Sequence, residues 1–223
     1  MHAHRFTAVL FDVDGTLVDS NDAHARAWVE AFADSGIIVD FTRVRRCIGM
    51  GGDKLMPEVS GVNEESEKGT AIAKRRAEIF ADRFLPALRP FPDAGRLVAD
   101  LKDQGYTVVA ASSAKRDELQ PLLEIAGADA LMDASTSSDD AESSKPDPDI
   151  IHAALKRAGA TAAEAVMIGD TPYDVEAARR AGLAVIAFRC GGWRDEDLTG
   201  AVAIYDGPWD LLRRLAESPL GRQ

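Results

Sequence analysis

Cysteine is scarce in this chain of 223 residues, and long apolar runs are missing. The two cysteines, Cys47 and Cys190, form neither a disulfide framework nor the close spacing of a cysteine metal site, so we expect reduced thiols in a reducing compartment. The N-terminal stretch "MHAHRF" lacks the apolar region of a secretion signal, and no apolar run approaches the roughly 20 residues that span a bilayer. The sequence therefore predicts a cytoplasmic protein that does not enter membranes.

Positive charge is also in short supply. Lys and Arg number 26 against 37 Asp and Glu, and the formal net charge is −11. Because nucleic-acid phosphates and anionic lipid surfaces are bound by basic surfaces, this balance argues against both as partners. The hydrophobic fraction of 46% is enough for a sizeable core, in one large domain or in a domain with a smaller companion.

Short apolar segments alternate with amphipathic ones along most of the chain. Several apolar segments are continuous, which is typical of strands covered on both faces. We predict strands at residues 7–13, 106–112, 128–134, 165–170, 184–188 and 201–205. Between them, residues 93–105, 115–127, 147–159 and 174–182 have the apolar spacing of helices and end in glycine. The predicted fold class is α/β, with a Rossmann-like parallel sheet core and helices on both faces.

The alternation is interrupted once, by residues 20–88, which show no strand signal and indicate several helices. Ser20 or Asn21 can cap the first of these helices. We expect two domains: an α/β core made of residues 1–19 and 89–223, and a helical cap, residues 20–88, inserted after the first strand. The polar stretch 134–149 of the core is expected to form one long surface loop.

Polar side chains stand where the predicted strands end. They are Asp12 and Asp14 after the first strand, Ser112 and Ser113 after the second, Lys145 in the loop after the third, and Asp170 and Asp174 after the fourth. Open parallel sheets bind ligands beyond the carboxyl ends of their strands, so we expect these side chains to gather there. Three of the carboxylates, Asp12, Asp14 and Asp170, would form an anionic pocket suited to Mg²⁺, and Lys145 adds a positive charge that attracts phosphate.

Each of these signals has a plainer interpretation when it is taken alone. Asp-x-Asp-Gly is a common turn, lysine before proline is common in loops, and Asp170 or Thr171 could simply cap the following helix. An EF-hand calcium loop starting at Asp12 is excluded, because Leu17 and Ala23 stand where glycine and glutamate are required. The order of the four signals along the predicted sheet favours a common site.

The chain resembles the haloacid dehalogenase-like (HAD) superfamily over essentially its whole length. The four motifs of that superfamily are matched by "DVDGT" (12–16), by Ser112 in "VVAASS", by Lys145 in "SKPDP" and by "GDTPYD" (169–174). The helical insertion resembles the cap of the phosphoglycolate phosphatase and β-phosphoglucomutase branch. The resemblance implies the HAD fold and an enzyme of phosphoryl chemistry, since the dehalogenases of this fold lack an acid at the position of Asp14.

The same resemblance implies a role for each motif residue. Asp12 would be the nucleophile that forms an aspartyl-phosphate, and Asp14 would act as acid and then as base. Mg²⁺ would be held by Asp12, Asp170 and the backbone carbonyl of Asp14, while Asp174 supports the water shell of the ion. Phosphate or substrate would be bound by Thr16, Ser112, Ser113 and Lys145.

Two cap residues are candidates for substrate binding. His24 lies one turn into the first cap helix, where related enzymes often place a histidine; the alternative is a lone surface histidine. Lys54 follows a glycine-rich loop, residues 49–52, which is flanked by the basic residues Arg43, Arg45 and Arg46. This loop is expected either to meet the leaving group of the substrate or only to join two helices.

The leading hypothesis is a Mg²⁺-dependent phosphatase that hydrolyses a phosphomonoester of a small metabolite, such as phosphoglycolate or a sugar phosphate. A β-phosphoglucomutase-like mutase would need a cap arginine where Gly52 stands, and a phosphonatase would need a cap lysine on the other side of Asp53 from Lys54. A non-catalytic binding module is a further alternative, but such a module would normally have lost some of the motif aspartates. We expect a monomer or a homodimer.

Overall fold

The computed structural model describes residues 6–221, so most of the N-terminal stretch "MHAHRF" lies outside the described residues. The chain divides into two compact units. The first unit is the chain up to Asp19 and again from Arg89 onward, and the second is Ser20–Leu88. The catalytic and substrate-specificity roles expected of these two segments stay predictions.

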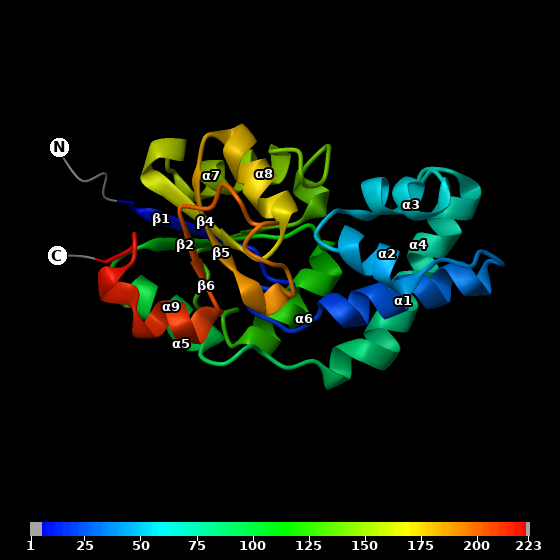
Figure 1. Cartoon of the computed structure of the whole chain (residues 1–223), viewed down its shortest axis with the longest axis horizontal. Coiled ribbons are helices and arrows are strands. Elements are labelled where there is room, and N and C mark those ends of the chain that lie inside the picture. Colours follow the sequence, from blue (N-terminus) through cyan, green and yellow to red (C-terminus); the bar gives the residue numbers. More distant parts are fainter. Residues whose placement is uncertain (1–5, 222–223) are drawn as a thin grey trace. The chain divides into compact units, whose positions relative to one another are not determined.

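A six-stranded parallel sheet forms the centre of the first unit (Figure 1). Its strands are β1 (Ala8–Phe11), β2 (Thr107–Ala111), β3 (Ala134–Thr136), β4 (Ala165–Gly169), β5 (Ala184–Phe188) and β6 (Ala203–Tyr205). They lie in the order β3-β2-β1-β4-β5-β6, and every neighbouring pair is parallel. Every residue of β1 and β4 is buried, as their continuous apolar sequences indicate. The predicted α/β fold class is confirmed.

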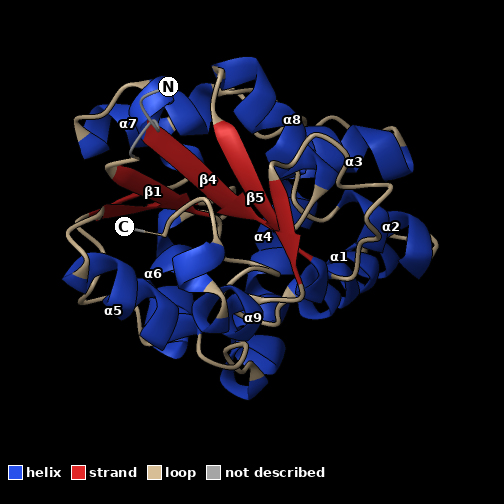
Figure 2. Ribbon diagram, turned by 60° about the vertical axis from the view of Figure 1, so that its left-hand side comes forward, coloured by secondary structure: helices blue, strands red, loops and turns tan. Residues whose placement is uncertain are grey.

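Helices cover both faces of this sheet. They are α5 (Ala94–Asp103), α6 (Arg116–Ala126), α7 (Asp149–Ala158), α8 (Pro172–Ala181) and α9 (Pro208–Arg213). Helices α7 and α8 lie on one face, and α5, α6 and α9 lie on the other (Figure 1, Figure 2). Glycines in the left-handed conformation follow α6, α7 and α8. The chain adds β2 and β3 on one side of β1 and then β4, β5 and β6 on the other side, so the strand order reverses between β1 and β4. An open parallel sheet binds its ligand beyond the carboxyl ends of the two strands at such a reversal.

One predicted strand is wrong. Residues 128–134 mostly form a turn, in which the N–H groups of Leu131 and Met132 donate to the Ala128 carbonyl at 3.0 and 3.1 Å. The third strand is instead β3, whose sequence "AST" belongs to the polar stretch expected as a surface loop. Thr136 can be buried there because its hydroxyl donates to the Ala110 carbonyl at 3.0 Å, which satisfies the polar group inside the sheet.

Helices also make up most of the second unit. Its α-helices are α1 (Asn21–Asp34), α2 (Phe41–Cys47), α3 (Gly52–Ser60) and α4 (Glu67–Ile79), and α4 continues into a π-helical turn, η1 (Phe80–Phe84), and a 3₁₀ turn, η2 (Leu85–Ala87). Helix α1 packs against α2 and α4. The Asp40 and Ser66 side chains cap α2 and α4 by accepting from backbone N–H groups. Ser20 holds the N-cap position of α1, but the side-chain capping bond expected there is not made.

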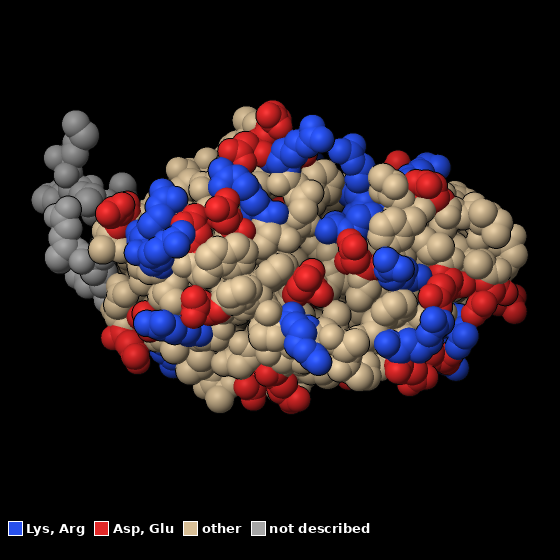
Figure 3. All heavy atoms as spheres, turned by 60° about the horizontal axis from the view of Figure 1, so that its bottom comes forward, with Lys and Arg blue, Asp and Glu red and all other residues tan. Residues whose placement is uncertain are grey.

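Within its described residues, the first unit also contains four short 3₁₀ turns. These are η3 (Ser138–Asp140), η4 (Ala162–Glu164), η5 (Arg189–Gly191) and η6 (Leu215–Glu217). Within residues 6–221, no helix has the length and apolar character needed to cross a membrane. On the face drawn in Figure 3, basic and acidic side chains are interspersed.

Candidate active site

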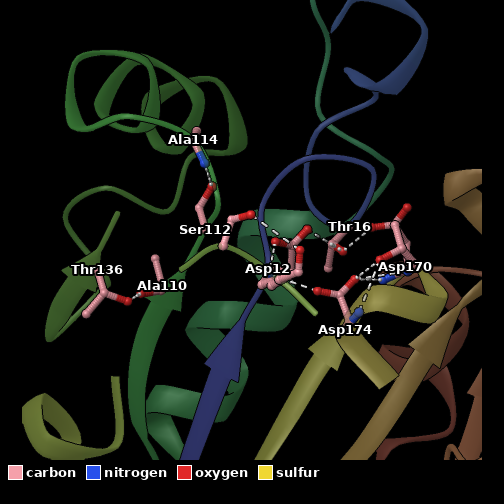
Figure 4. Close-up of polar contacts among 11 residues, drawn as sticks. Asp12, Thr16, Ala110, Ser112, Ala114, Thr136, Asp170 and Asp174 are labelled. Carbon is pink, nitrogen blue, oxygen red and sulfur yellow. Dashed lines mark hydrogen bonds and ion pairs between the residues drawn. The ribbon is translucent and has the colours of Figure 1, made fainter. Parts of the chain in front are cut away.

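Asp12 and Asp170 lie close together because the strands that precede them are neighbours. β1 pairs with β4 in the register Phe11 to Ile168, and the Asp12 N–H extends this pairing by donating to the Ile168 carbonyl at 2.8 Å. Both aspartates are buried, and both lie just beyond the strand ends (Figure 4). Two carboxylates from distant parts of the sequence therefore meet at one edge of the sheet.

The loop after β1 turns back sharply at Gly15, which has a φ of 73°. The next three N–H groups, of residues 16–18, all donate to the Val13 carbonyl at 2.9–3.3 Å. This turn buries Thr16, whose hydroxyl lies 3.0 Å from Asp170 Oδ1 and 3.4 Å from Asp12 Oδ2 (Figure 4). The hydroxyl of Thr16 thus connects the two carboxylates, and its predicted contact with phosphate stays a prediction.

Lys145 is a buried ammonium held between two carboxylates. Its Nζ lies 2.6 Å from Asp12 Oδ1 and 2.8 Å from Asp174 Oδ1, and its side chain is 1% exposed. Burial alone would lower the pKa of this lysine, but the charges of Asp12 and Asp174 outweigh burial and raise it. Lys145 therefore stays charged and neutralises part of the carboxylate cluster.

Asp174 has two structural roles in addition to its pairing with Lys145. Its Oδ2 accepts from the N–H groups of Asp170 and Thr171 and from the Thr171 hydroxyl, at 3.2, 3.0 and 2.7 Å. Thr171 in turn accepts from the Asp174 N–H, so the two residues form a capping box at the start of α8. Gly169 allows this close approach, because a Cβ built there would lie 2.6 Å from the Cγ of Asp174.

Ser112 follows β2, the other neighbour of β1. It is buried, its N–H donates to the Thr136 carbonyl at 3.1 Å, and its hydroxyl oxygen accepts from the Ala114 N–H at 3.0 Å (Figure 4). With the oxygen engaged in this way, the hydroxyl proton is directed away from the Ala114 N–H and can be offered to a phosphoryl oxygen. Ser113 is half-buried next to it. Binding of phosphate by either serine stays a prediction.

The carboxylates of this cluster outnumber its positive charge. Oxygen atoms of Asp12, Asp170 and Asp174 lie within 4.8 Å of one another, and all three residues are buried. Burial raises the pKa of Asp12 to about 7; Lys145 opposes this shift, while the nearby charges of Asp174 and the half-buried Asp14 add to it. When ionised, the three carboxylates and the ammonium carry a net charge of −2. This donor set of hard oxygens with unbalanced charge fits a divalent cation such as Mg²⁺.

The two cap candidates lie in the second unit. His24 is 5% exposed and stacks on Phe80, with ring centroids 4.0 Å apart, so the alternative of a lone surface histidine is wrong. Lys54 lies in the first turn of α3. The glycine-rich loop joins α2 to α3, and two of its basic neighbours are paired within this unit: Arg45 with Asp22 at 2.7 Å, and Arg43 with the Glu58 carbonyl. A contact of His24 or Lys54 with substrate stays a prediction.

Comparison with known proteins places the chain in a family. The sequence model of the family described as haloacid dehalogenase-like hydrolase matches residues 9–188. The chain belongs to this family. It is 33% identical to the probable phosphatase IndB of Dickeya dadantii, over 95% of this chain and 97% of that protein. It is 29% identical to a phosphoglycolate phosphatase of Rhodospirillum rubrum, over 89% of this chain and 86% of that protein.

Solved structures agree with this assignment. The crystal structure of a hydrolase from Pseudomonas syringae has a TM-score of 0.89 and 31% identity, and the match covers 95% of this chain and 98% of that one. Both the HAD fold and the assignment as a hydrolase enzyme, predicted from the motifs, are confirmed.

One residue that borders the carboxylate cluster of this HAD-family hydrolase, Gly191, was not predicted from the sequence. Gly191, in the turn η5 after β5, approaches Asp170 so closely that a Cβ at Gly191 would overlap the Asp170 carboxylate. The only signal in the sequence is the pair of glycines in "CGGW" (190–193), which is separated by one residue from the predicted strand 184–188. Such a pair indicates a turn at the ligand-binding edge, but it does not indicate which residue the turn contacts.

Proposed function

We propose that this HAD-family hydrolase is a Mg²⁺-dependent phosphatase that hydrolyses the phosphomonoester of a small metabolite through an aspartyl-phosphate. The observation that carries the proposal is the buried ion pair between Lys145 and Asp12, set beside Asp170 and Asp174. A cluster of this kind offers a carboxylate nucleophile together with the positive charge that a phosphoryl group requires. The names of the relatives, a probable phosphatase and a phosphoglycolate phosphatase, support the same reaction.

In the proposed reaction, a carboxylate oxygen of Asp12 forms a bond to phosphorus while the bond from phosphorus to the ester oxygen breaks. Asp14 donates a proton to the departing alcohol, and the phosphoryl group remains on Asp12. Asp14 then takes a proton from the water that attacks the aspartyl-phosphate, which releases phosphate and restores the carboxylate of Asp12 and the protonated carboxyl group of Asp14. Lys145 and the Ser112 hydroxyl bind phosphoryl oxygens and offset their charge as the bonds change.

Mg²⁺ would be held by Asp12, Asp170 and the backbone carbonyl of Asp14, and Asp174 would support its water ligands. When bound, the ion neutralises negative charge on the phosphate and on the carboxylates. The contacts of Asp170 and Asp12 with the Thr16 hydroxyl would fix the orientation of two of these ligands.

We assign substrate selection to the second unit, Ser20–Leu88, and retain Lys54 and His24 as its candidates for contact with the leaving group. The mutase alternative is weakened at Gly52, because glycine stands where a mutase would need a cap arginine. Phosphoglycolate and sugar phosphates remain the substrates to try first. A cytoplasmic location and a monomeric or homodimeric state remain predictions.

The experiment is phosphate release from a panel of phosphorylated metabolites and from p-nitrophenyl phosphate, with Mg²⁺ or with a chelator. The wild type should turn over at least one substrate only with Mg²⁺, Asp12→Asn should be inactive, and Asp129→Asn, a change at an exposed turn residue, should behave as the wild type. Turnover by Asp12→Asn at the wild-type rate, or full activity with chelator, would contradict the proposal.

A further inference from the structure

The short turn η5 (Arg189–Gly191) touches the candidate metal site at two points. Gly191 lies against the carboxylate of Asp170, where even one methyl group would overlap it. The thiol of the preceding residue, Cys190, donates to the carbonyl of Gly15 at 3.4 Å, and Gly15 belongs to the loop that carries Asp14 and Thr16. The turn therefore borders both loops that supply the proposed ligands.

Asp170 is confined from two sides as a result. The Thr16 hydroxyl lies 3.0 Å from its Oδ1, while Gly191 closes the space beside its Oδ2. A carboxylate confined in this way has few orientations available before a metal ion arrives. Groups that restrict a metal ligand in this manner raise metal affinity, because less conformational freedom is lost on binding.

The position of η5 is itself fixed by Arg189. The Arg189 guanidinium binds both carboxylate oxygens of Asp195, with Nε 2.6 Å from Oδ1 and Nη2 2.9 Å from Oδ2. Its third nitrogen, Nη1, lies 2.8 Å from Asp206 Oδ1, directly after β6. One side chain thus ties the residue that opens η5 both to the loop that follows η5 and to the next strand of the sheet.

Exposed ion pairs usually contribute little, and these side chains are 38% exposed for Arg189 and 55% and 61% for the two aspartates. The ion pairs of Arg189 differ from ordinary exposed pairs in their geometry. All three guanidinium nitrogens are used, and the bond to Asp195 is bidentate, an arrangement that gives orientation as well as attraction. Arg189 is therefore suited to holding a turn in one position.

We propose that Arg189 is a positioning residue for the candidate magnesium site, which it serves by holding η5, and with it Gly191, against Asp170. Arg189 itself contacts neither the metal nor the substrate. The inference rests on the proposed function, because it assigns a determinant of metal affinity to the same site. It predicts that loosening η5 weakens metal binding even though every proposed ligand is still present.

The test is calorimetric titration of Mg²⁺ into the full-length protein. Arg189→Met removes the ion pairs of Arg189 with Asp195 and Asp206. Asp195→Asn removes one of the two negative charges paired with Arg189 and leaves the shape of the side chain almost unchanged. Gly191→Ala displaces the Asp170 carboxylate directly. The matched control is Arg75→Met, which breaks an exposed pair with Asp34. We expect a dissociation constant about 10- to 100-fold higher for Arg189→Met and Gly191→Ala, a smaller increase for Asp195→Asn, and no change for the control.

The kinetic readout distinguishes positioning from a purely structural role. In Arg189→Met and Asp195→Asn, the Mg²⁺ concentration that gives half-maximal activity should rise, while kcat at saturating Mg²⁺ stays near the wild-type value. If the wild type binds Mg²⁺ and both Arg189→Met and Asp195→Asn bind it within about twofold of the wild type, the inference is overturned and the proposed function stands. If Arg189→Met does not fold, Asp195→Asn and Gly191→Ala decide by the same criterion. If the wild type binds no Mg²⁺, the proposed function and the inference both fail.

Discussion

The ammonium of Lys145 lies 2.6 Å from Asp12 Oδ1, although 133 residues separate them in the chain. The same ammonium lies 2.8 Å from Asp174 Oδ1, so one buried cation serves two buried carboxylates. Asp170 adds a third buried carboxylate, so the three carboxylates together carry more negative charge than the ammonium of Lys145 offsets. The stability of the metal-free protein and its response to Mg²⁺ both follow from this imbalance.

Replacing Lys145 with methionine should destabilise the metal-free protein by about 3–5 kcal/mol, because the change leaves buried carboxylates without their compensating charge. The measurement is urea unfolding at neutral pH with a chelator present. Lys102→Met, which breaks a half-exposed pair with Asp133, is the control and should cost no more than about 1 kcal/mol. Equal losses in the two variants would contradict the account.

Replacing Asp12 with asparagine should stabilise the metal-free protein at about pH 8. The pKa of Asp12 is raised from 3.8 to about 7 in the folded state, so between these values the folded protein binds more protons than the unfolded chain. The contribution of this group to stability therefore falls as the pH rises through that interval. In Asp12→Asn this component of the pH dependence should vanish. A variant that is less stable than the wild type at about pH 8, measured by denaturant unfolding with chelator, would count against the unbalanced cluster.

Mg²⁺ should raise the thermal unfolding temperature of the wild type. At a concentration about 100 times the dissociation constant, the gain in unfolding free energy is about 2.7 kcal/mol. In Asp170→Asn, which removes a buried carboxylate but keeps the shape of the side chain, the gain should nearly disappear. A thermal shift series with Mg²⁺ and with K⁺ as the ionic-strength control gives the answer, and the same shift in both proteins would refute this ligand assignment.

Asp133 should stabilise the fold at neutral pH but not in acid. The hydrogen bond from Lys102 at 2.6 Å lowers the pKa of this carboxyl, and the Val108 N–H at 3.0 Å lowers it further. A lowered folded-state pKa gives stability that is present above the unfolded value of 3.8 and is lost as the pH falls below it. Asp133→Asn should therefore be less stable than the wild type by up to about 1 kcal/mol near neutral pH, and the difference should close in acid. A difference that does not change with pH in urea unfolding would be evidence against this linkage.

The strands in the middle of the sheet could be predicted because their continuous apolar sequences indicate burial on both faces. β1 and β4 are apolar without interruption and end at aspartates, so both the sheet and the edge that carries Asp12 and Asp170 follow from the sequence. β3 was not predictable in the same way. Its "AST" is polar, and Thr136 is accepted in the interior because its hydroxyl donates to the Ala110 carbonyl of the neighbouring strand β2.

The contacts between individual side chains of the site could not be predicted, because they join segments that lie far apart in the sequence. Asp174 was read as a possible supporter of a metal, yet it also closes a capping box with Thr171 and pairs with Lys145. Gly191 showed only that a turn was present, because its contact with Asp170 depends on how β5 lies beside β4. The sequence thus predicts which carboxylate, hydroxyl and lysine side chains gather at the site. Which of them contact one another can be known only from the folded structure.

The central claim is that the carboxylate of Asp12 accepts the phosphoryl group. The most direct measurement is peptide mass spectrometry of the wild type after acid quenching during turnover of a substrate from the panel. The account predicts phosphate on the peptide that contains Asp12, removed by hydroxylamine and absent from Asp12→Asn. An active wild type that carries no phosphate on this peptide at any quench time, or carries it on a different residue, would contradict it.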